Sequence, residues 1–221
     1  MKLKKQSSLI IGRNKEKKML QAIYQSNKPE LLAVYGRRRV GKTFLLTRFF
    51  QEQNSVNSIF FYCSGIQKAT MKDQLEAFVT QISETFYEGL AIAPQKKWTH
   101  AFDVLTKAMT TVPPNKKIIL LFDEAPWMAT RKSQFLEAFD YYWNRYWTQN
   151  NRLKVIVCGS SASWIIENFI NNKGGLYNRV TRTLELNPFS LKEAHDFLAH
   201  ANIKLNQSQV LELQGNLINL K

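Results

Sequence analysis

The sequence has little of the chemistry that disulfide-stabilised and metal-binding proteins use. Its 221 residues include two cysteines and three histidines. Cys63 and Cys158 each end a strand-like apolar run, where a small buried thiol is an ordinary core residue. The histidines, His100, His195 and His200, are not spaced from one another or from cysteine as zinc ligands usually are. The sequence therefore argues against a disulfide framework and against a zinc site.

Long apolar runs are also missing. No stretch is long enough to cross a bilayer, and the first residues do not form a charged and then apolar signal segment. With 44% hydrophobic and 12% aromatic residues, the composition is that of a globular chain that can bury a core. We therefore expect a cytoplasmic protein with no membrane contact.

Acidic residues are scarce relative to basic ones. Asp and Glu number 17 against 31 Lys and Arg, which gives a formal net charge of +14. The excess is densest near the start of the sequence, at Lys2, Lys4, Lys5, Arg13, Lys15, Lys17 and Lys18. A basic surface binds anions, so nucleic acid is a candidate partner. A solvated helix face that aids solubility explains the same charge, and composition leaves both interpretations open.

The sequence does contain a complete phosphate-binding loop of the pattern G-x-x-x-x-G-K-T. The loop lies between an apolar run at residues 30–35 and a helix-like segment at 43–51, which is the strand, loop and helix order that the pattern requires. We expect the loop residues and the one that follows them to contact a nucleotide. These residues are Gly36, Arg37, Arg38, Arg39, Val40, Gly41, Lys42, Thr43 and Phe44.

Each part of this loop has a physical role. Gly36 and Gly41 let the backbone curl so that successive amides point at phosphate oxygens, and the start of the helix adds its positive end. Lys42 is expected to be an exposed ligand of the β and γ phosphates, and the Thr43 hydroxyl is expected to bind Mg²⁺. The loop thus predicts ATP and Mg²⁺ as cofactors.

Two further predicted strands end in polar residues. Residues 118–122 are apolar and lead into Asp123 and Glu124. At the carboxyl edge of a parallel sheet, Asp123 can hold the magnesium shell and Glu124 can activate the water that attacks the γ phosphate. The strand at 153–158 leads to Ser160, which can touch that phosphate or water.

The helical segments are predicted from apolar periodicity. We expect helices at 15–25 with Asn14 as N-cap, 67–87, 98–109, 133–149, 164–170 capped by Ser161 or Ser163, 191–199 and near 207–213. The helix at 133–149 carries seven aromatic residues, more than one face needs. We expect Phe135, Phe139, Tyr142 or Trp143, and Tyr146 to pack on the sheet. The surplus rings can cover a loop, a protein partner or bases.

In this order the motifs resemble the archaeal-type ATPases of the AAA+ superfamily, a family also widespread in bacteria. Pro126-Trp127, residues 174–180 and residues 186–191 add to the resemblance, which runs from about residue 11 to 198. The resemblance implies that the segment Ile11, Gly12 and Arg13 lies against adenine. It also implies that Arg179, with Arg182 as the alternative, reaches a nucleotide of its own or a neighbouring subunit.

The predicted fold class is α/β: a three-layer P-loop NTPase core at residues 1–189, followed by an incomplete helical lid at 190–221. Its mainly parallel five-stranded sheet has strands near Leu31, Ile59, Ile119, Val155 and Leu184. By family resemblance, the Val155 strand lies between the phosphate-loop strand and the Asp-Glu strand. No counterpart of the lid arginine of many relatives is recognisable, which leaves the efficiency of turnover open.

The predicted function is Mg²⁺-dependent ATP hydrolysis coupled to a conformational change. The alternative is a nucleotide-switched module that binds nucleic acid or protein with little turnover, and self-association is compatible with either. A GTPase is disfavoured because the segment 172–174, Asn-Lys-Gly, neither follows a strand nor supplies the aspartate that reads guanine. A nucleoside kinase is disfavoured because a strand that ends in Asp-Glu is better suited to activating water.

Overall fold

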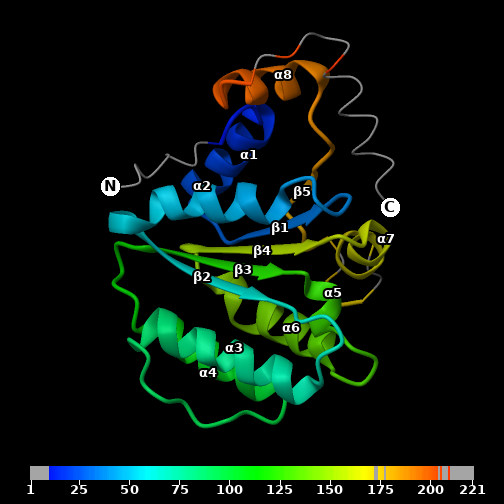
Figure 1. Cartoon of the computed structure of the whole chain (residues 1–221). Helices are drawn as coiled ribbons and strands as arrows, with labels where there is room; N and C mark the ends of the chain where they lie inside the picture. Colours follow the sequence, from blue (N-terminus) through cyan, green and yellow to red (C-terminus); the bar gives the residue numbers. More distant parts are fainter. Residues whose placement is uncertain (1–9, 172–173, 177, 204, 206–208, 210–221) are drawn as a thin grey trace, which may run out of the picture.

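The computed structural model describes residues 10–171, 174–176, 178–203, 205 and 209. It is built around a five-stranded sheet of strand order β2-β3-β4-β1-β5 (Figure 1). The strands are β1 (Glu30–Tyr35), β2 (Ser58–Ser64), β3 (Lys117–Asp123), β4 (Leu153–Gly159) and β5 (Arg182–Glu185). Every pairing is parallel, and β4 lies between β1 and β3 as expected. The predicted α/β fold class is confirmed.

Helices cover both faces of the sheet and make the molecule a three-layer structure (Figure 1). One face packs against α1 (Asn14–Gln25) and α2 (Lys42–Asn57), and the other against α3 (Met71–Phe86), α4 (Trp98–Thr110) and α6 (Phe135–Arg145). Because both faces are covered, the central strands β1, β3 and β4 are almost entirely buried. This explains their nearly continuous apolar sequences.

The strand register brings the polar motifs to one edge of the sheet. Tyr35, the last residue of β1, pairs with Gly159, the last residue of β4. Ser64 at the end of β2 pairs with Asp123 at the end of β3. Since all strands run in the same direction, the segments that follow them leave the sheet on the same side.

Helices α1 and α3 begin at residues other than those expected. Arg13, with a left-handed backbone (φ 55°), precedes α1, so Asn14 is the first residue of the helix and not its cap. Helix α3 begins at Met71 and not at residue 67, because the Thr70 side chain accepts a hydrogen bond from the Asp73 amide and the Asp73 side chain reaches back to Thr70. This reciprocal capping fixes the start of the helix.

The segment after β4 also differs from expectation. It forms α7 (Ala162–Ile165), which continues as a π-helical turn, η2 (Ile166–Ile170). Ser161 occupies the N-cap position but makes no side-chain capping bond, and Ser163 lies inside the helix.

The aromatic segment at 133–149 forms two helices and not one. Helix α6 ends at Arg145, and a short 3₁₀ helix, η1 (Trp147–Gln149), follows it. The backbone departs from helical geometry at Tyr146 (φ −125°), which leaves that side chain 43% exposed while Trp147 turns inward and is buried. The expectation that Tyr146 packs on the sheet is therefore wrong. Phe135, Phe139, Tyr142 and Trp143 do enter the core.

Two further helices follow strands of the sheet. Helix α5 (Ala125–Met128) comes directly after β3, and α8 (Leu191–His200) follows β5 after the irregular segment 186–190. Ser190 caps α8 in a reciprocal arrangement with Glu193. The helix expected near 207–213 lies outside the described residues, and the domain boundary at residue 189 stays a prediction.

None of the helices in the described part of the chain combines the length and hydrophobicity needed to cross a bilayer. Cys63 and Cys158 are both buried free thiols, as ordinary core residues are.

Replacement of Gly36 by alanine tests how closely the backbone at the end of β1 approaches that after β5. Gly36 has φ +150°, and an added Cβ would lie 2.2 Å from the Leu186 carbonyl oxygen. Neither strand can retreat easily, because the Leu186 amide donates to the Tyr35 carbonyl at 2.8 Å. We expect Gly36→Ala to lower the free energy of unfolding by about 3 kcal/mol or more.

Gly89→Ala is the matched control for this substitution. Gly89 also has a positive φ (+86°), but nothing lies within 4 Å of its added Cβ. Gly89→Ala should therefore lower the free energy of unfolding only by the cost of the backbone strain, about 1–2 kcal/mol. Urea unfolding of both variants measures the difference, and equal losses would show that the approach to Leu186 is not limiting.

Candidate active site

The loop from β1 to α2 has the conformation that a phosphate-binding loop requires. Gly41, with φ +90°, precedes the first helical residue, Lys42, and Arg39 also adopts a left-handed backbone (φ 65°). Left-handed residues in a turn of this kind direct successive amides toward a common point, which makes an anion-binding concavity. The N-terminus of α2 adds its positive end there.

Lys42 is buried, contrary to the expectation of an exposed ligand. Its exposed fraction is 6%, and its ammonium group donates to the carbonyl oxygens of Gly36 and Arg37, both at 2.8 Å. The loop thus encloses the Lys42 side chain. The ammonium group has three N–H donors, so one remains for a phosphate oxygen, and a charged acceptor makes a stronger hydrogen bond than a carbonyl does.

The loop and the Asp-Glu strand meet at a direct hydrogen bond. The Thr43 hydroxyl donates to Asp123 Oδ2 at 2.7 Å, and Asp123 is buried with an exposed fraction of 2%. The backbone amide of Glu124 donates to the other carboxylate oxygen at 3.1 Å. The two residues predicted to hold Mg²⁺ are therefore adjacent.

Tyr62 is a member of this group that the sequence reasoning missed. Its hydroxyl donates to Asp123 Oδ2 at 3.4 Å. Burial, followed by the nearby Asp123 charge, raises the pKa of Tyr62 to about 12, so the phenol stays protonated as a donor at neutral pH. Its position two residues before the end of β2 was the available signal, since β2 pairs with β3.

The oxygen atoms of Thr43 and Asp123 fit a magnesium ion chemically. Magnesium prefers oxygen ligands, keeps several waters, and is bound in nucleotide sites through one or two carboxylates together with phosphate oxygens. Among the described residues there is no cluster of three or more His, Cys, Asp and Glu side chains that could enclose a metal without such help. Thr43 and Asp123 would therefore need phosphate oxygens of a nucleotide as further ligands to hold a magnesium ion.

Glu124 and Ser160 also lie together. The Ser160 amide and hydroxyl both donate to Glu124 Oε2, at 3.2 and 3.0 Å. Glu124 has a left-handed backbone (φ 44°) because the chain leaves β3 there and enters α5, where the Trp127 amide donates to the Glu124 carbonyl at 2.9 Å. This turn directs the Glu124 side chain toward the end of β4.

The remaining loop residues differ in exposure. Arg37, Arg38 and Arg39 are exposed, and the Arg38 guanidinium donates through Nε to the Ser160 hydroxyl at 3.4 Å. Val40 is half-buried, and Phe44 is 47% exposed at the start of α2.

Arg13 joins the segment before α1 to the loop and to the turn before α8. Its guanidinium donates to the Val40 carbonyl at 3.3 Å and to Glu16 at 3.2 Å, and it lies 4.4 Å from the ring centre of Phe189. Its backbone amide donates to the Glu193 carboxylate at 3.1 Å. The two hydrogen bonds and the ring contact therefore offset the cost of burying this guanidinium.

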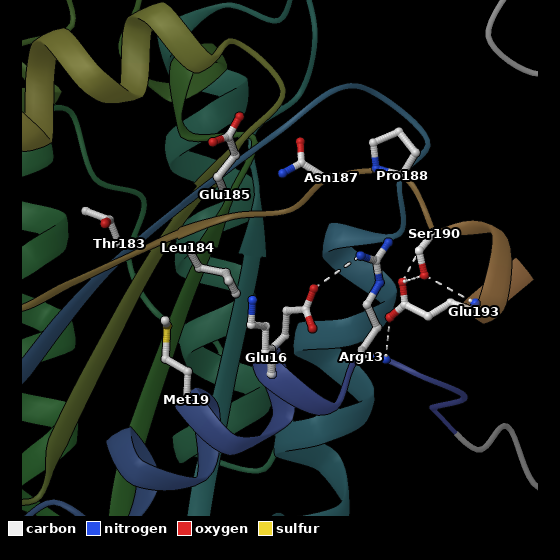
Figure 2. A pocket seen from close by; sticks show the side chains of 11 residues that line it. Arg13, Glu16, Met19, Thr183, Leu184, Glu185, Asn187, Pro188, Ser190 and Glu193 are labelled. Carbon is white, nitrogen blue, oxygen red and sulfur yellow. Dashed lines mark hydrogen bonds and ion pairs between the residues drawn. The ribbon is translucent and has the colours of Figure 1, made fainter.

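A hollow of about 560 Å³ lies beside Arg13 (Figure 2). Its walls come from α1, β5 and the start of α8, and they include Glu16, Met19, Leu184 and Glu193. Ile11 and Gly12, half-buried, immediately precede Arg13. The hollow is separate from the carboxyl-edge group of Asp123 and Glu124, and Arg13 connects the two through Val40.

The two candidate arginines near β5 are not brought to this group. Arg179 is exposed, and none of the hydrogen bonds and ion pairs of the described residues joins its side chain to Lys42, Glu124 or Ser160. Arg182 is exposed and pairs with Leu32, three residues before the end of β1. Neither position shows a role toward the nucleotide of its own chain.

Comparison with known proteins agrees with this arrangement. A model of an ATPase domain found predominantly in Archaea matches residues 10–214. An uncharacterized protein of Methanocaldococcus jannaschii is 24% identical over 193 residues, which are 87% of this chain and 39% of that protein.

Two solved structures share the fold. The Walker-type ATPase of Pyrococcus abyssi aligns with a TM-score of 0.62 and 20% identity, over 92% of this chain and 62% of that one. The ORC2 protein of Aeropyrum pernix, solved as ADPNP-ADP complexes, aligns with a TM-score of 0.63 and 15% identity, over 86% of this chain and 52% of that one. The chain thus spans only about two fifths to three fifths of these relatives.

Lys42→Ala tests whether the loop binds phosphate. The substitution removes a charged donor worth about 1.5–3 kcal/mol to a phosphate group, so we expect affinity for magnesium-ATP to fall at least tenfold. Lys72→Ala, which removes an exposed lysine of α3, is the charge-matched control. Calorimetric titration measures both, and parent-like affinity in Lys42→Ala would contradict the assignment of the loop.

Proposed function

Because the chain belongs to the family of ATPase domains found predominantly in Archaea, we propose that it binds ATP with Mg²⁺ and hydrolyses the bond to the terminal phosphate. The observation that supports this most directly is the group at the carboxyl edge of the sheet. There Thr43 bonds to Asp123, and the next residue, Glu124, bonds to Ser160. A metal-binding pair and a candidate base thus lie beside a phosphate-binding loop.

The phosphates of ATP bind to the loop amides and to Lys42. Arg37, Arg38 and Arg39 add positive charge around the same concavity. The segment of Ile11, Gly12 and Arg13 lies against the base, while Val40 and Phe44 border the sugar and base from the side of α2. The Arg13 contact with the Val40 carbonyl supports this placement, because it holds the segment against the loop.

Thr43 and Asp123 would hold the magnesium ion, with Asp123 acting through a bound water. When bound, the ion neutralises charge on the β and γ phosphates. The buried Asp123 carboxylate keeps its orientation through the Glu124 amide and the Tyr62 hydroxyl. These donors fix the carboxylate before any nucleotide arrives.

Glu124 is the residue that we assign to activation of water. Its carboxylate accepts the proton as the water oxygen bonds to the γ phosphorus and the bond to the β-γ bridging oxygen breaks, which leaves ADP and inorganic phosphate. Ser160 orients the carboxylate through its amide and hydroxyl. It also lies where it can report the state of the γ phosphate.

Hydrolysis is coupled to movement of α8, which we assign to the helical lid. Arg13 contacts the loop at Val40, and on its other side it stacks on Phe189 and bonds through its amide to Glu193. A shift of the loop carbonyl is thereby passed to the first turn of α8. Arg179, which is exposed, is assigned to a neighbouring subunit's nucleotide.

The second candidate is a nucleotide-switched module that binds nucleic acid. It is favoured by the charge of +14 and by the exposure of Lys15 and Lys18 on α1. Lys17 is less free, since it donates to the Ile10 carbonyl at 3.3 Å, and Lys2, Lys4 and Lys5 lie outside the described residues. Turnover measured with and without DNA or RNA separates the two candidates, because a switch with little turnover hydrolyses almost nothing under either condition.

Replacement of each of the two adjacent acids by its amide should impair different steps of ATP binding and hydrolysis. Glu124→Gln keeps the shape of the side chain but cannot take a proton, so we expect unchanged ATP affinity and a fall in kcat on the order of 100-fold or more. Asp123→Asn should in addition raise the Mg²⁺ concentration needed for half-maximal binding.

Steady-state kinetics and magnesium titrations of both variants measure these effects. Glu84→Gln, an exposed carboxylate near the end of α3, is the control and should behave like the parent. Parent-like kcat in both Glu124→Gln and Asp123→Asn would remove the hydrolytic assignment.

A further inference from the structure

Arg38 is the one loop arginine that the described residues show in contact with the Glu124 and Ser160 pair. Its Nε donates to the Ser160 hydroxyl at 3.4 Å, and that hydroxyl donates to Glu124 Oε2 at 3.0 Å. The donors and acceptors therefore run in one direction, from a guanidinium cation through a hydroxyl to a carboxylate.

A second contact places Arg38 beside α5, the helix that follows Glu124. Its Cζ lies 5.9 Å from the ring centre of Trp127 in α5. Trp127 is held in place, because its amide donates to the Glu124 carbonyl at 2.9 Å and its own carbonyl accepts from Gln74 at 3.1 Å. Arg38 thus bridges the end of β4 and the first turn after β3, the two elements that position the acid.

This arrangement restrains Glu124 as a base. A hydroxyl whose oxygen accepts from a cation is a stronger donor, so Arg38 strengthens the Ser160 bond to the carboxylate. Oε2 also accepts from the Ser160 amide, and these two bonds use both lone pairs of that oxygen. A carboxylate that is held at the end of β4 by two donors on one oxygen has less freedom to turn toward an attacking water.

From these contacts, and resting on the proposed ATPase function, we infer that Arg38 distinguishes ATP from ADP. Arg38 is exposed and can leave Ser160, and a guanidinium binds phosphate with two parallel bonds that a neutral hydroxyl cannot match. The γ phosphate of ATP takes Arg38 from Ser160, which weakens the hold on Glu124 and frees it for the attacking water. ADP lacks this phosphate and leaves the contact in place.

Arg38→Ala and Arg38→Lys test the inference, with Arg48→Ala as the matched control. Arg48 is also exposed and also lies 5.9 Å over an aromatic ring, that of Phe44, but no role in the site is assigned to it. We expect Arg38→Ala to weaken binding of a non-hydrolysable ATP analogue about tenfold with unchanged ADP affinity. Lysine keeps the charge but not the paired donors, so Arg38→Lys should lie between.

Trp127 fluorescence gives a readout that a merely structural role of Arg38 would not change. The chain has five tryptophans, so the difference between each protein and its Trp127→Phe derivative isolates the Trp127 emission. The ATP analogue should change this emission in the parent and in Arg48→Ala, whereas ADP should not. In Arg38→Ala both nucleotides should leave it unchanged.

The possible failures are distinguishable. If Arg38→Ala has the nucleotide affinities and the fluorescence response of Arg48→Ala, or if ADP and the analogue change the parent's Trp127 emission equally, the inference is overturned. If the parent binds no ATP, the proposed function is overturned, and the role of Arg38 with it. Thermal unfolding of each variant confirms that the comparison is made between folded proteins.

Discussion

The hydrogen bond between Thr43 and Asp123 is the contact on which the site depends. At 2.7 Å it joins the first residues of α2 to the end of β3, two segments that are 80 residues apart in the sequence. It can form because β1 and β3 are parallel and are separated by β4, so that their carboxyl ends reach the same edge. The fold thereby sets one phosphate-binding and one acidic segment at hydrogen-bonding distance.

Charge compensation explains why polar groups can be buried at this edge. Lys42 is buried but donates to two loop carbonyls, and Asp123 is buried but accepts from Thr43, Tyr62 and the Glu124 amide. Unpaired groups at the same depth would be costly. Binding of a nucleotide would add an acceptor for Lys42 and, by the inference drawn above, would replace the Ser160 hydroxyl as the acceptor of Arg38.

The sequence allowed the sheet and its polar ends to be predicted, because buried parallel strands are continuous apolar runs and the loop pattern is local. It did not reveal the left-handed turn at Glu124, which brings that side chain to Ser160, because such a turn is fixed by α5 and its packing. The inward turn of Trp147 in place of Tyr146 was missed for a similar reason. A helical period assumes an unbroken helix, and the break at Tyr146 shifts the face by one residue.

Long-range contacts of single side chains were the least predictable. Arg13 was placed near the nucleotide by family resemblance alone, and its bonds to Val40 and Glu193 join positions 27 and 180 residues away. The Arg38 contact with Ser160 spans 122 residues. No local pattern encodes such pairs.

The central claim is that this edge of the sheet hydrolyses ATP, and release of inorganic phosphate from ATP by the parent protein tests it most directly. With excess Mg²⁺, phosphate should accumulate in proportion to protein and to time, in equal amount to ADP, and chelation of the metal with EDTA should stop it. Phosphate release that is indistinguishable from the rate without protein, at concentrations where ATP is bound, would contradict the account.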